Sequence, residues 1–457
     1  MLIDKDLLKK YNVPTPRYTS YPPANFFTGK FNYHEAVKSI DDSNNAQPEN
    51  ISFYLHIPFC SQLCSYCGCN THITHDKNII QNYVDDLKQE ILLYKNHLSP
   101  NRKISQIHWG GGTPDYLSIG QIKSLMQLFF DNFEFIDNPE IAMECHPAHL
   151  TYEYMDELAG MKFNRISLGV QDFEVKVLNA VNRALPNLPI NEIVKYLQSK
   201  NIPVNLDFVY GLPLQTVESF SKTIEKAIAI SPDRIALFSY AHVPWVKPHQ
   251  KILEKYALPK AGLKTEIFEM AFSKFTNNNY VSIGLDHFAK PGDELADALK
   301  NKNLSRNFQG YCTRRTTGQV YALGVSGISQ LNSAFLQNTK DLKTYSRKIS
   351  EGVFPFEKVY FLNKDEKIIG HIITEIMTNR YVSSKQIQSL FNVSFHEIVA
   401  ITKLDFSKLQ ELKDEGLIEI SNFGIAVTHK GMFFLRNIAA VFDPLMQQPG
   451  KKFSKAL

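Results

Sequence analysis

Short apolar runs alternate with longer amphipathic stretches over the first 290 residues of the chain. Runs rich in β-branched and aromatic residues predict strands, and apolar positions at helical spacing predict helices. The predicted strands are 51–57, 104–109, 141–145, 165–170, 204–209, 234–240 and 280–284. The predicted helices are 78–98, 119–133, 150–161, 188–200, 216–230 and 262–278. This alternation predicts an α/β fold, a partial (β/α)6 TIM-like barrel, with its chemistry at the carboxyl ends of the strands.

The rest of the chain divides into an arm, a connection and a smaller unit. Residues 1–44 form an N-terminal arm, whose proline-rich part reads as extended chain. The barrel takes residues 45–290, and residues 291–360 read as a loop-rich connection that completes the active site. Residues 361–457 predict a mostly helical, winged-helix-like lid domain, because helical stretches precede a hairpin there.

Composition narrows the class of protein. The chain has 457 residues, of which 44% are apolar, so it can bury the cores of more than one domain. No apolar run approaches the ~20 residues that span a bilayer, and the charged start does not resemble a secretory signal. We therefore expect a cytoplasmic monomer without a membrane span. A net charge of +4 is too small to indicate a nucleic-acid partner, and we expect none.

Four of the six cysteines lie within ten residues: Cys60, Cys64, Cys67 and Cys69. In an intracellular protein such clustering indicates a metal or redox role and not disulfides. The first three have the spacing C-x3-C-x2-C, and three thiolates can bind three irons of a [4Fe–4S] cube while the fourth iron stays open. The alternative is a zinc knot completed by the fourth thiol, in a zinc-stabilised winged-helix regulator. Zinc ligands usually come in two separated pairs, which favours the cluster.

The C-x3-C-x2-C spacing resembles that of the radical S-adenosylmethionine superfamily. The run GGGTP (110–114), at the end of a predicted strand, matches the superfamily's loop for the methionine amino group, where glycines let a ligand approach the backbone. Further motifs lie in one order along nearly the whole chain: PRYTSYP (16–22), YLHIPFC (54–60), CGCN (67–70), HWGGGTP (108–114), GVQDF (169–173), NLDFVYGLP (205–213), YAHVP (240–244), DHFAKP (286–291) and NFQGY (307–311). Together they resemble the oxygen-independent coproporphyrinogen III dehydrogenase (oxidase) family of haem biosynthesis.

The resemblance implies an oxygen-independent oxidative decarboxylation. Two propionates of coproporphyrinogen III become vinyls, giving protoporphyrinogen IX, after a 5′-deoxyadenosyl radical takes a hydrogen from the propionate β-carbon. It also implies one [4Fe–4S] cluster, one or two S-adenosylmethionine molecules, and an electron donor and an electron acceptor of unknown identity. The alternative within the superfamily is a haem chaperone without oxidase activity. Such relatives generally lack the PRYTSYP arm and the fourth cysteine, and both are present here.

The resemblance also implies roles for individual residues. The iron ligands are Cys60, Cys64 and Cys67, and the catalytic residues are Tyr54, near the sulfonium, and Cys69. Cys69 either assists proton or electron handling or supports the cluster loop. The remaining cofactor-binding residues are Tyr66 beside the thiols, Gly111, Gly112 and Thr113 along the pocket, Glu144 and Arg183 at the methionine end, Gln171 and Asp207 at the ribose, Ala241 at adenine, and Gln309 and Ile328 at a second S-adenosylmethionine.

Two features depart from this pattern or extend it. The family usually has an acid two positions after the glutamate, and His146 stands there instead, which leaves the role of that acid in doubt. Four substrate carboxylates call for cationic contacts. Arg17 in the arm is the first candidate. Arg314 and Arg315 either meet substrate carboxylates as well or belong to a solvated loop.

Overall fold

The computed structural model describes residues 5–447 and 453 of the chain. The first four residues of the predicted arm, and residues 448–452 and 454–457 of the predicted lid domain, lie outside the described residues.

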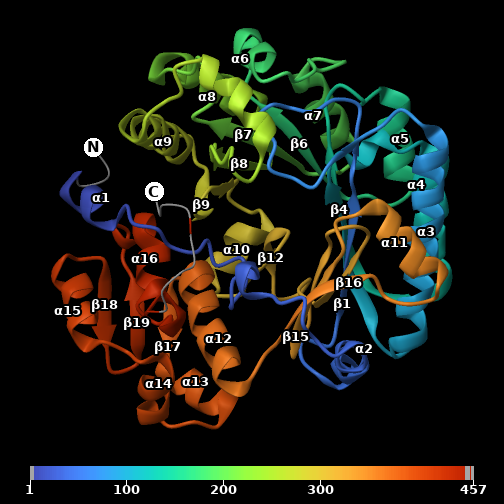
Figure 1. The fold of residues 1–457 in the computed structure, drawn as a ribbon. Helices are drawn as coiled ribbons and strands as arrows, with labels where there is room; N and C mark the ends of the chain where they lie inside the picture. Colours follow the sequence, from blue (N-terminus) through green and yellow to red (C-terminus); the bar gives the residue numbers. More distant parts are fainter. Residues whose placement is uncertain (1–4, 448–452, 454–457) are drawn as a thin grey trace.

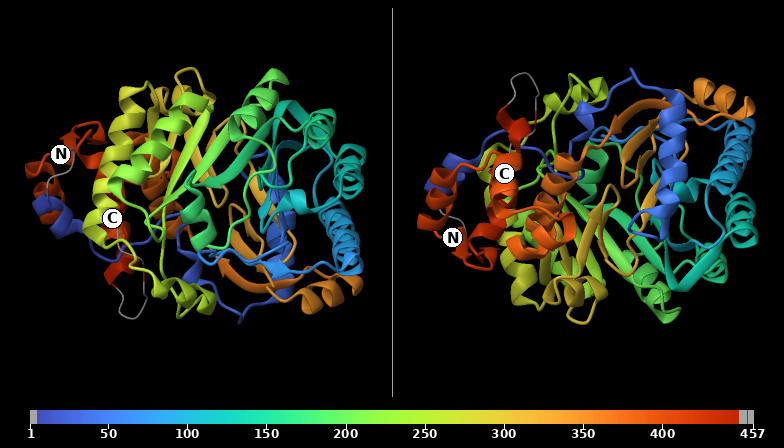
Figure 2. Two further views of the ribbon diagram at one scale, coloured as in Figure 1. Left: turned by 90° about the horizontal axis from the view of Figure 1, so that it is seen from above. Right: turned by 90° about the horizontal axis from the view of Figure 1, so that it is seen from below.

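Six of the seven parallel strands form the centre of a twelve-stranded sheet, with the strand order β16-β15-β14-β13-β1-β4-β5-β6-β7-β8-β10-β9. The six are β1 (Ile51–Ile57), β4 (Lys103–Gly111), β5 (Glu134–Cys145), β6 (Arg165–Gln171), β7 (Val204–Tyr210) and β8 (Arg234–Ser239). The helices between them are α3 (Lys77–His97), α4 (Ile119–Asn132), α5 (Tyr152–Gly160), α6 (Val175–Ala180), α7 (Ile190–Ser199), α8 (Val217–Ile230) and, after β8, α9 (Ala261–Asn277). They cover the outer face of the curved sheet (Figures 1 and 2). The predicted α/β fold with a partial (β/α)6 barrel is confirmed.

Burial on both faces explains why the central strands read as nearly continuous apolar runs. In β1, six of the seven residues are buried, and Phe53 packs its ring against Phe129 of α4. The helix α4 begins at a capping box, in which Ser118 and Gln121 satisfy each other's backbone N–H groups. Apolar burial and capping together fix where each strand and helix lies.

The prediction of a loop-rich connection at 291–360 is wrong. This segment contains α10 (Glu294–Lys300), β11 (Leu304–Asn307), β12 (Gly310–Thr313), β13 (Gln319–Leu323), β14 (Ile328–Gln330), β15 (Ala334–Asn338), α11 (Leu342–Ser350) and β16 (Phe356–Phe361). Strand β13 lies parallel to β1, and β14 to β16 continue the sheet in antiparallel order. All five residues of β13 are buried, so its sequence shows no alternation that would mark a strand. The predicted strand at 280–284 exists as β9 (Val281–Gly284), but it pairs antiparallel with β10 (His287–Ala289), which pairs antiparallel with β8 at the end of the same sheet.

The arm is only partly extended, because it also contains α1 (Lys5–Tyr11) and α2 (Tyr33–Asp42). Between these helices it runs along the C-terminal unit and the barrel (Figure 1). Tyr18 and Tyr21 are buried in the core of the C-terminal unit, and the Tyr18 hydroxyl donates to Asp443 Oδ2 at 2.9 Å. These tyrosines anchor the PRYTSYP segment, which includes Arg17, to the C-terminal unit.

The C-terminal unit consists of helices around a small antiparallel sheet of strand order β17-β19-β18. Its elements are α12 (Lys364–Asn379), β17 (Tyr381–Ser383), α13 (Ser384–Phe391), α14 (Phe395–Thr402), α15 (Phe406–Asp414), β18 (Ile418–Ser421), β19 (Gly424–Val427) and α16 (Leu435–Ala440). Its role as a lid stays a prediction. Over the described part of the chain, every helix is too short or too polar to cross a membrane.

Candidate active site

The cysteine loop, residues 58–73, follows β1 at the carboxyl edge of the parallel strands and is held by polar contacts to its backbone. Three neighbouring side chains from one segment bind its carbonyl oxygens. Lys247 Nζ donates to Cys69 O at 2.7 Å, His249 Nε2 lies 2.9 Å from Cys67 O, and Gln250 Nε2 donates to Tyr66 O at 3.0 Å. The loop therefore has a fixed shape that does not depend on disulfides, since all six cysteines are free.

The thiols of this loop lie among polar partners. Cys60 Sγ lies 3.1 Å from Thr113 Oγ1, and Arg183 Nη1 donates to Cys64 Sγ at 3.6 Å. Burial raises the pKa of Cys60 to about 11. A hydrogen bond with the Cys69 thiol lowers the pKa of Cys67 to about 6, and the same bond together with burial raises the pKa of Cys69. The loop thus brings the fourth cysteine into contact with one of the three predicted iron ligands.

A row of side chains crosses from β1 to β5 at the same edge. Tyr54 of β1 pairs in register with His108 of β4, and their rings stack with centroids 6.0 Å apart. His108 Nε2 lies 3.1 Å from Glu144 Oε1, and the backbone N–H of Gly111 donates to Glu144 Oε2 at 3.4 Å. Burial raises the pKa of Tyr54, and the nearby charges of Glu144 and Cys69 raise it further. The predicted catalytic tyrosine and the predicted methionine-binding carboxylate therefore share one wall of the site.

The glycine loop fits closely against this wall. A Cβ on Gly110 would lie 2.9 Å from the Glu144 carboxylate, and one on Gly112 would lie 2.6 Å from Pro58 O. Gly111 has a φ of +118°, a conformation that side chains disfavour. Gly111 and Gly112 therefore require glycine, whereas a methyl group at Gly110 fits once the Glu144 carboxylate moves.

A second group of side chains extends over β6 and β7. Arg183 Nη1 donates to the Tyr66 hydroxyl at 3.2 Å, and its other terminal nitrogen donates to Gly169 O. Asp207 accepts from Ser167 Oγ at 2.8 Å, and burial raises the pKa of Asp207 to about 6. A Cβ on Gly169 would lie 2.8 Å from both Arg183 Nη2 and Gln171 Nε2, which places the Gln171 amide beside the guanidinium.

The predicted residues for a second cofactor lie apart from these groups. Gln309 sits in the turn between β11 and β12, and Ile328 begins β14 in the large sheet. The ring of Phe308, which precedes Gln309, packs at 6.1 Å against Phe335 of β15, the strand that pairs with β14. The Gln309 Oε1 atom is buried and has no hydrogen-bond partner among the described residues. Ala241 follows β8 and is exposed.

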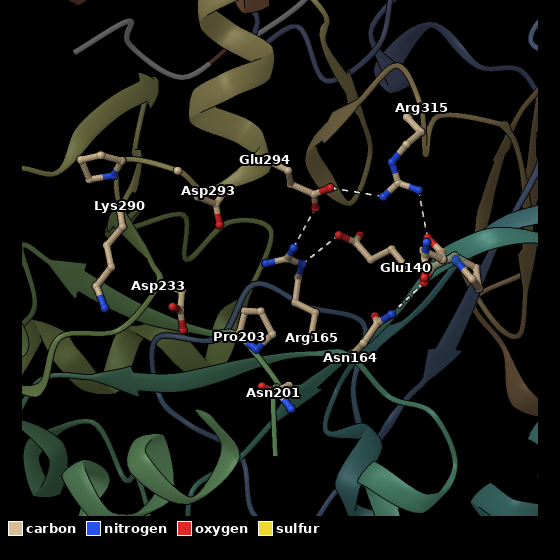
Figure 3. Close-up of a pocket in the computed structure, with 14 residues that line it drawn as sticks. Glu140, Asn164, Arg165, Asn201, Pro203, Asp233, Lys290, Asp293, Glu294 and Arg315 are labelled. Carbon is tan, nitrogen blue, oxygen red and sulfur yellow. Dashed lines mark hydrogen bonds and ion pairs between the residues drawn. The ribbon is translucent and has the colours of Figure 1, made fainter. Parts of the chain in front are cut away.

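Two arginines considered for substrate carboxylates form ion pairs within the protein. Arg314 pairs with Glu375 at 2.6 Å, and Arg315 pairs with Glu294 at 3.4 Å. Arg315 lines a cavity of about 490 Å³ at the opposite, amino-terminal edge of the strands, where Arg165 bridges Glu294 and a second glutamate (Figure 3). Each arginine is therefore paired with a carboxylate away from the cysteine loop, which leaves Arg17 as the better candidate for a substrate carboxylate.

His146 stands in a buried turn. The ring Nδ1 of His146 accepts from the Ala148 backbone N–H at 3.1 Å, and the backbone N–H of His146 donates to Asp115 Oδ2 at 2.9 Å. Burial lowers the pKa of His146 to about 2, and the charge of Arg183 contributes. It is therefore neutral, and it supports the turn after β5 without replacing the missing acid's charge.

Sequence reasoning missed three residues at this edge. His56 lies 3.1 Å from the Tyr54 hydroxyl, and His108 connects that ring with Glu144. Side chains alternate between the two faces of a strand, and this alternation along β1 and β4 could have placed both histidines on the same face as Tyr54. Arg306 of β11 gave no such signal, because tertiary packing alone brings it to Arg17.

A cationic cluster borders the site. Arg17 Nη2 pairs with Asp286 Oδ2 at 2.6 Å, and Arg306 Nη1 donates to Arg17 O at 3.1 Å. Burial alone would raise the pKa of Asp286, but a hydrogen bond to His287 and the charges of both arginines lower it well below its usual range. Burial raises the pKa of Tyr210, the last residue of β7, to about 12; the charge of Asp286 adds to this rise, and the charge of Arg17 opposes it. The cluster therefore lies beside the carboxyl edge of the barrel.

The donor set fits an iron–sulfur cluster with a bound cofactor. Three thiols from one loop suit separate irons of a cube. In residues 5–447 and 453, no three His, Cys, Asp or Glu side chains are arranged to hold a single metal ion. The close glycine backbone, the Glu144 carboxylate and the Arg183 guanidinium offer partners for the charged end of an amino acid.

The fold and site define a radical S-adenosylmethionine enzyme, and the model of the Radical SAM superfamily matches residues 54–227. The oxygen-independent coproporphyrinogen III oxidase of Synechocystis is 38% identical over 99% of this chain and 97% of its own length. The Escherichia coli enzyme of that name is 36% identical, with 99% and 98% covered. A solved structure of Escherichia coli coproporphyrinogen III oxidase, a radical SAM enzyme, has a TM-score of 0.88 and 34% identity, covering 97% of this chain and 99% of that one. The chain belongs to the oxygen-independent coproporphyrinogen III oxidase family, whose cofactors are a [4Fe–4S] cluster and S-adenosylmethionine.

Proposed function

We propose that this protein converts two propionates of coproporphyrinogen III to vinyls without oxygen, giving protoporphyrinogen IX. The observation that carries the proposal is a juxtaposition: the cysteine loop, Tyr54 and Glu144 share one edge of the barrel with Arg17 and its partners. A porphyrinogen with four carboxylates requires both a radical-generating centre and cationic contacts, and this edge provides both.

The cofactors supply a one-electron cleavage that produces a hydrogen-abstracting radical, and the protein positions and shields the reactants. Cys60, Cys64 and Cys67 would hold the cluster. Glu144 would bind the cofactor's amino group, since His108 and the Gly111 N–H hold that carboxylate in place.

The opposite end of the cofactor lies toward β6 and β7 in this proposal. Arg183 would bind the carboxylate, and Gln171 and Asp207 would bind the ribose. Tyr54 would border the sulfonium, because its ring is fixed against His108. Tyr66 would shield the thiols, Gly112 and Thr113 would line the pocket, and Ala241 would contact adenine.

Arg17 would bind a substrate carboxylate. A guanidinium has five N–H donors, and only Nη2 of Arg17 is engaged by Asp286. The side chain is 45% exposed, so its remaining donors are accessible. Arg306 would bind a second carboxylate. Its Nη1 donates to the backbone oxygen of Arg17, and its buried Nε has no hydrogen-bond partner among the described residues.

Cys69 would act beside the cluster, where its thiol contacts Cys67. The enzyme would bind one or two S-adenosylmethionine molecules, and Gln309 and Ile328 would contact the second. The enzyme would act as a cytoplasmic monomer with an external electron donor and acceptor.

An anaerobic assay tests the proposal. Reconstituted protein is incubated with coproporphyrinogen III, S-adenosylmethionine and dithionite, and the porphyrins are oxidised and separated by liquid chromatography. We expect divinyl product and two CO2 per substrate. Formation of 5′-deoxyadenosine without vinyl product would contradict the assigned substrate, and tight haem binding without turnover would support the chaperone alternative.

A further inference from the structure

One exposed segment lies directly against the cysteine loop. Residues 245–256 follow β8 and include the 3₁₀-helix η4 (Pro248–Lys255). The segment is anchored by Gln250 and Leu253, which are buried, and it reaches the loop through the hydrogen bonds of Lys247, His249 and Gln250 to its carbonyl oxygens. The segment therefore lies directly beside Cys67 and Cys69.

The outer surface of this segment is unusually apolar for an exposed stretch of chain. Trp245 is 75% exposed, Val246 is 63% exposed and Ile252 is 55% exposed. Exposed aromatic side chains grouped with aliphatic ones are typical of protein interfaces, where tryptophan often contributes most of the binding energy.

The same surface is cationic. Between residues 245 and 260 the chain has four lysines and one acid, Glu254. Glu254 pairs with His242 at 3.2 Å. Lys251, Lys255 and Lys260 are exposed. A basic rim around an apolar centre suits a partner with an acidic surface, because opposite charges steer the encounter and the apolar centre holds the complex.

We propose that residues 245–256 form the docking surface for a small acidic one-electron carrier protein that reduces the cluster. The proposal rests on the proposed function, in which the cluster takes up one electron for each cofactor cleaved. The carrier is oxidised by one electron and the cluster is reduced by one. Electron transfer requires close approach, and this surface contacts the backbone of two cysteines of the loop. A short-lived contact over a small area is usual for electron-transfer partners.

The probe is a tryptophan-free, acidic, low-potential [2Fe–2S] ferredoxin. The chain has two tryptophans, and Trp109 is fully buried, so acrylamide quenches the fluorescence of Trp245 selectively. Oxidised ferredoxin is expected to protect Trp245 from acrylamide, and salt is expected to remove the protection. If Trp245 is instead protected from acrylamide in the absence of ferredoxin, and this protection grows with the enzyme concentration, the surface binds a second copy of the chain and the proposal is overturned.

Stopped-flow mixing with reduced ferredoxin measures cluster reduction without any porphyrinogen. The variant Lys251→Glu/Lys255→Glu is expected to slow reduction by ferredoxin at least ~tenfold at low ionic strength, and to leave reduction by dithionite within about twofold of wild type. The matched control is Lys385→Glu/Lys408→Glu, an equal charge change at exposed positions of the C-terminal unit, which is expected to change neither rate. Trp245→Ala should also slow the ferredoxin reaction.

Two outcomes would overturn the proposal: equal ferredoxin rates in the variant and the control, or a parallel loss with dithionite. Because these measurements omit substrate, they remain valid if the assay for vinyl product fails. A failure of the proposed function and a failure of the docking surface are thus distinguishable.

Discussion

Replacing Gly110 by alanine tests the arrangement of the glycine loop and Glu144. The new Cβ would lie 2.9 Å from Glu144 Oε1, about 0.5 Å inside ordinary contact. The Glu144 side chain is 43% exposed, so it can move, and the cost to folding is small. The Gly111 N–Glu144 Oε2 hydrogen bond is already 3.4 Å long, and a movement of about 0.5 Å takes it beyond hydrogen-bond range.

The expected effect is on cofactor binding. Hydrogen bonds to charged groups contribute about 1.5–3 kcal/mol, so a displaced carboxylate should weaken S-adenosylmethionine binding about ten- to a hundredfold. Isothermal titration of the reconstituted protein, performed anaerobically, measures the affinity, and iron content and melting temperature report the integrity of the variant. The matched control is Gly120→Ala, where a Cβ meets nothing within 4 Å. A Gly110→Ala protein with full iron content that binds the cofactor within twofold of wild type would refute the reasoning.

Three further predictions concern single side chains. Cys64→Ser should lose most of its four irons after reconstitution, whereas Cys69→Ser should retain them, and equal iron loss in both variants would make the fourth thiol a ligand. Arg17→Gln should raise the KM for coproporphyrinogen III about tenfold or more with kcat within about threefold, because a charge-assisted bond to substrate is lost, and an unchanged KM would contradict its role. Burial raises the pKa of Glu90 from 4.5 to about 7, because the protein interior favours the protonated carboxyl. The stability that this protonation contributes is complete below pH 4.5 and is lost as the pH rises through 7. Between pH 4.5 and 7.5 the free energy of unfolding of Glu90→Gln should therefore rise relative to that of wild type by on the order of 3 kcal/mol, which melting temperatures measured across this range would show. A difference between the two proteins that does not change with pH would contradict this account.

Periodicity predicted the six parallel strands and most of their helices, because each buries an apolar face that the spacing reveals. It failed for β13, where burial of all five residues removes the alternation. It also gave no prediction for α2, a short helix of the arm that Asn32 caps.

The candidate site was predictable where one loop or one strand end carries the chemistry. The cysteines and the glycine loop are local motifs, and parallel strands bring their ends together. The contacts of Arg17 depend on the burial of Tyr18 and Tyr21 in the distant C-terminal unit, which no local pattern encodes. The ion pairs of Arg314 and Arg315 could not be predicted for the same reason: their partners lie 61 and 21 residues away in sequence.

The origin of the hydrogen that ends up in 5′-deoxyadenosine tests the central claim most directly. Coproporphyrinogen III deuterated at the β-carbons of its propionates is incubated anaerobically with the reconstituted protein, S-adenosylmethionine and dithionite, and the 5′-deoxyadenosine is analysed by mass spectrometry. The account predicts deuterium in 5′-deoxyadenosine together with divinyl product. Unlabelled 5′-deoxyadenosine, with the porphyrinogen recovered intact, would contradict it.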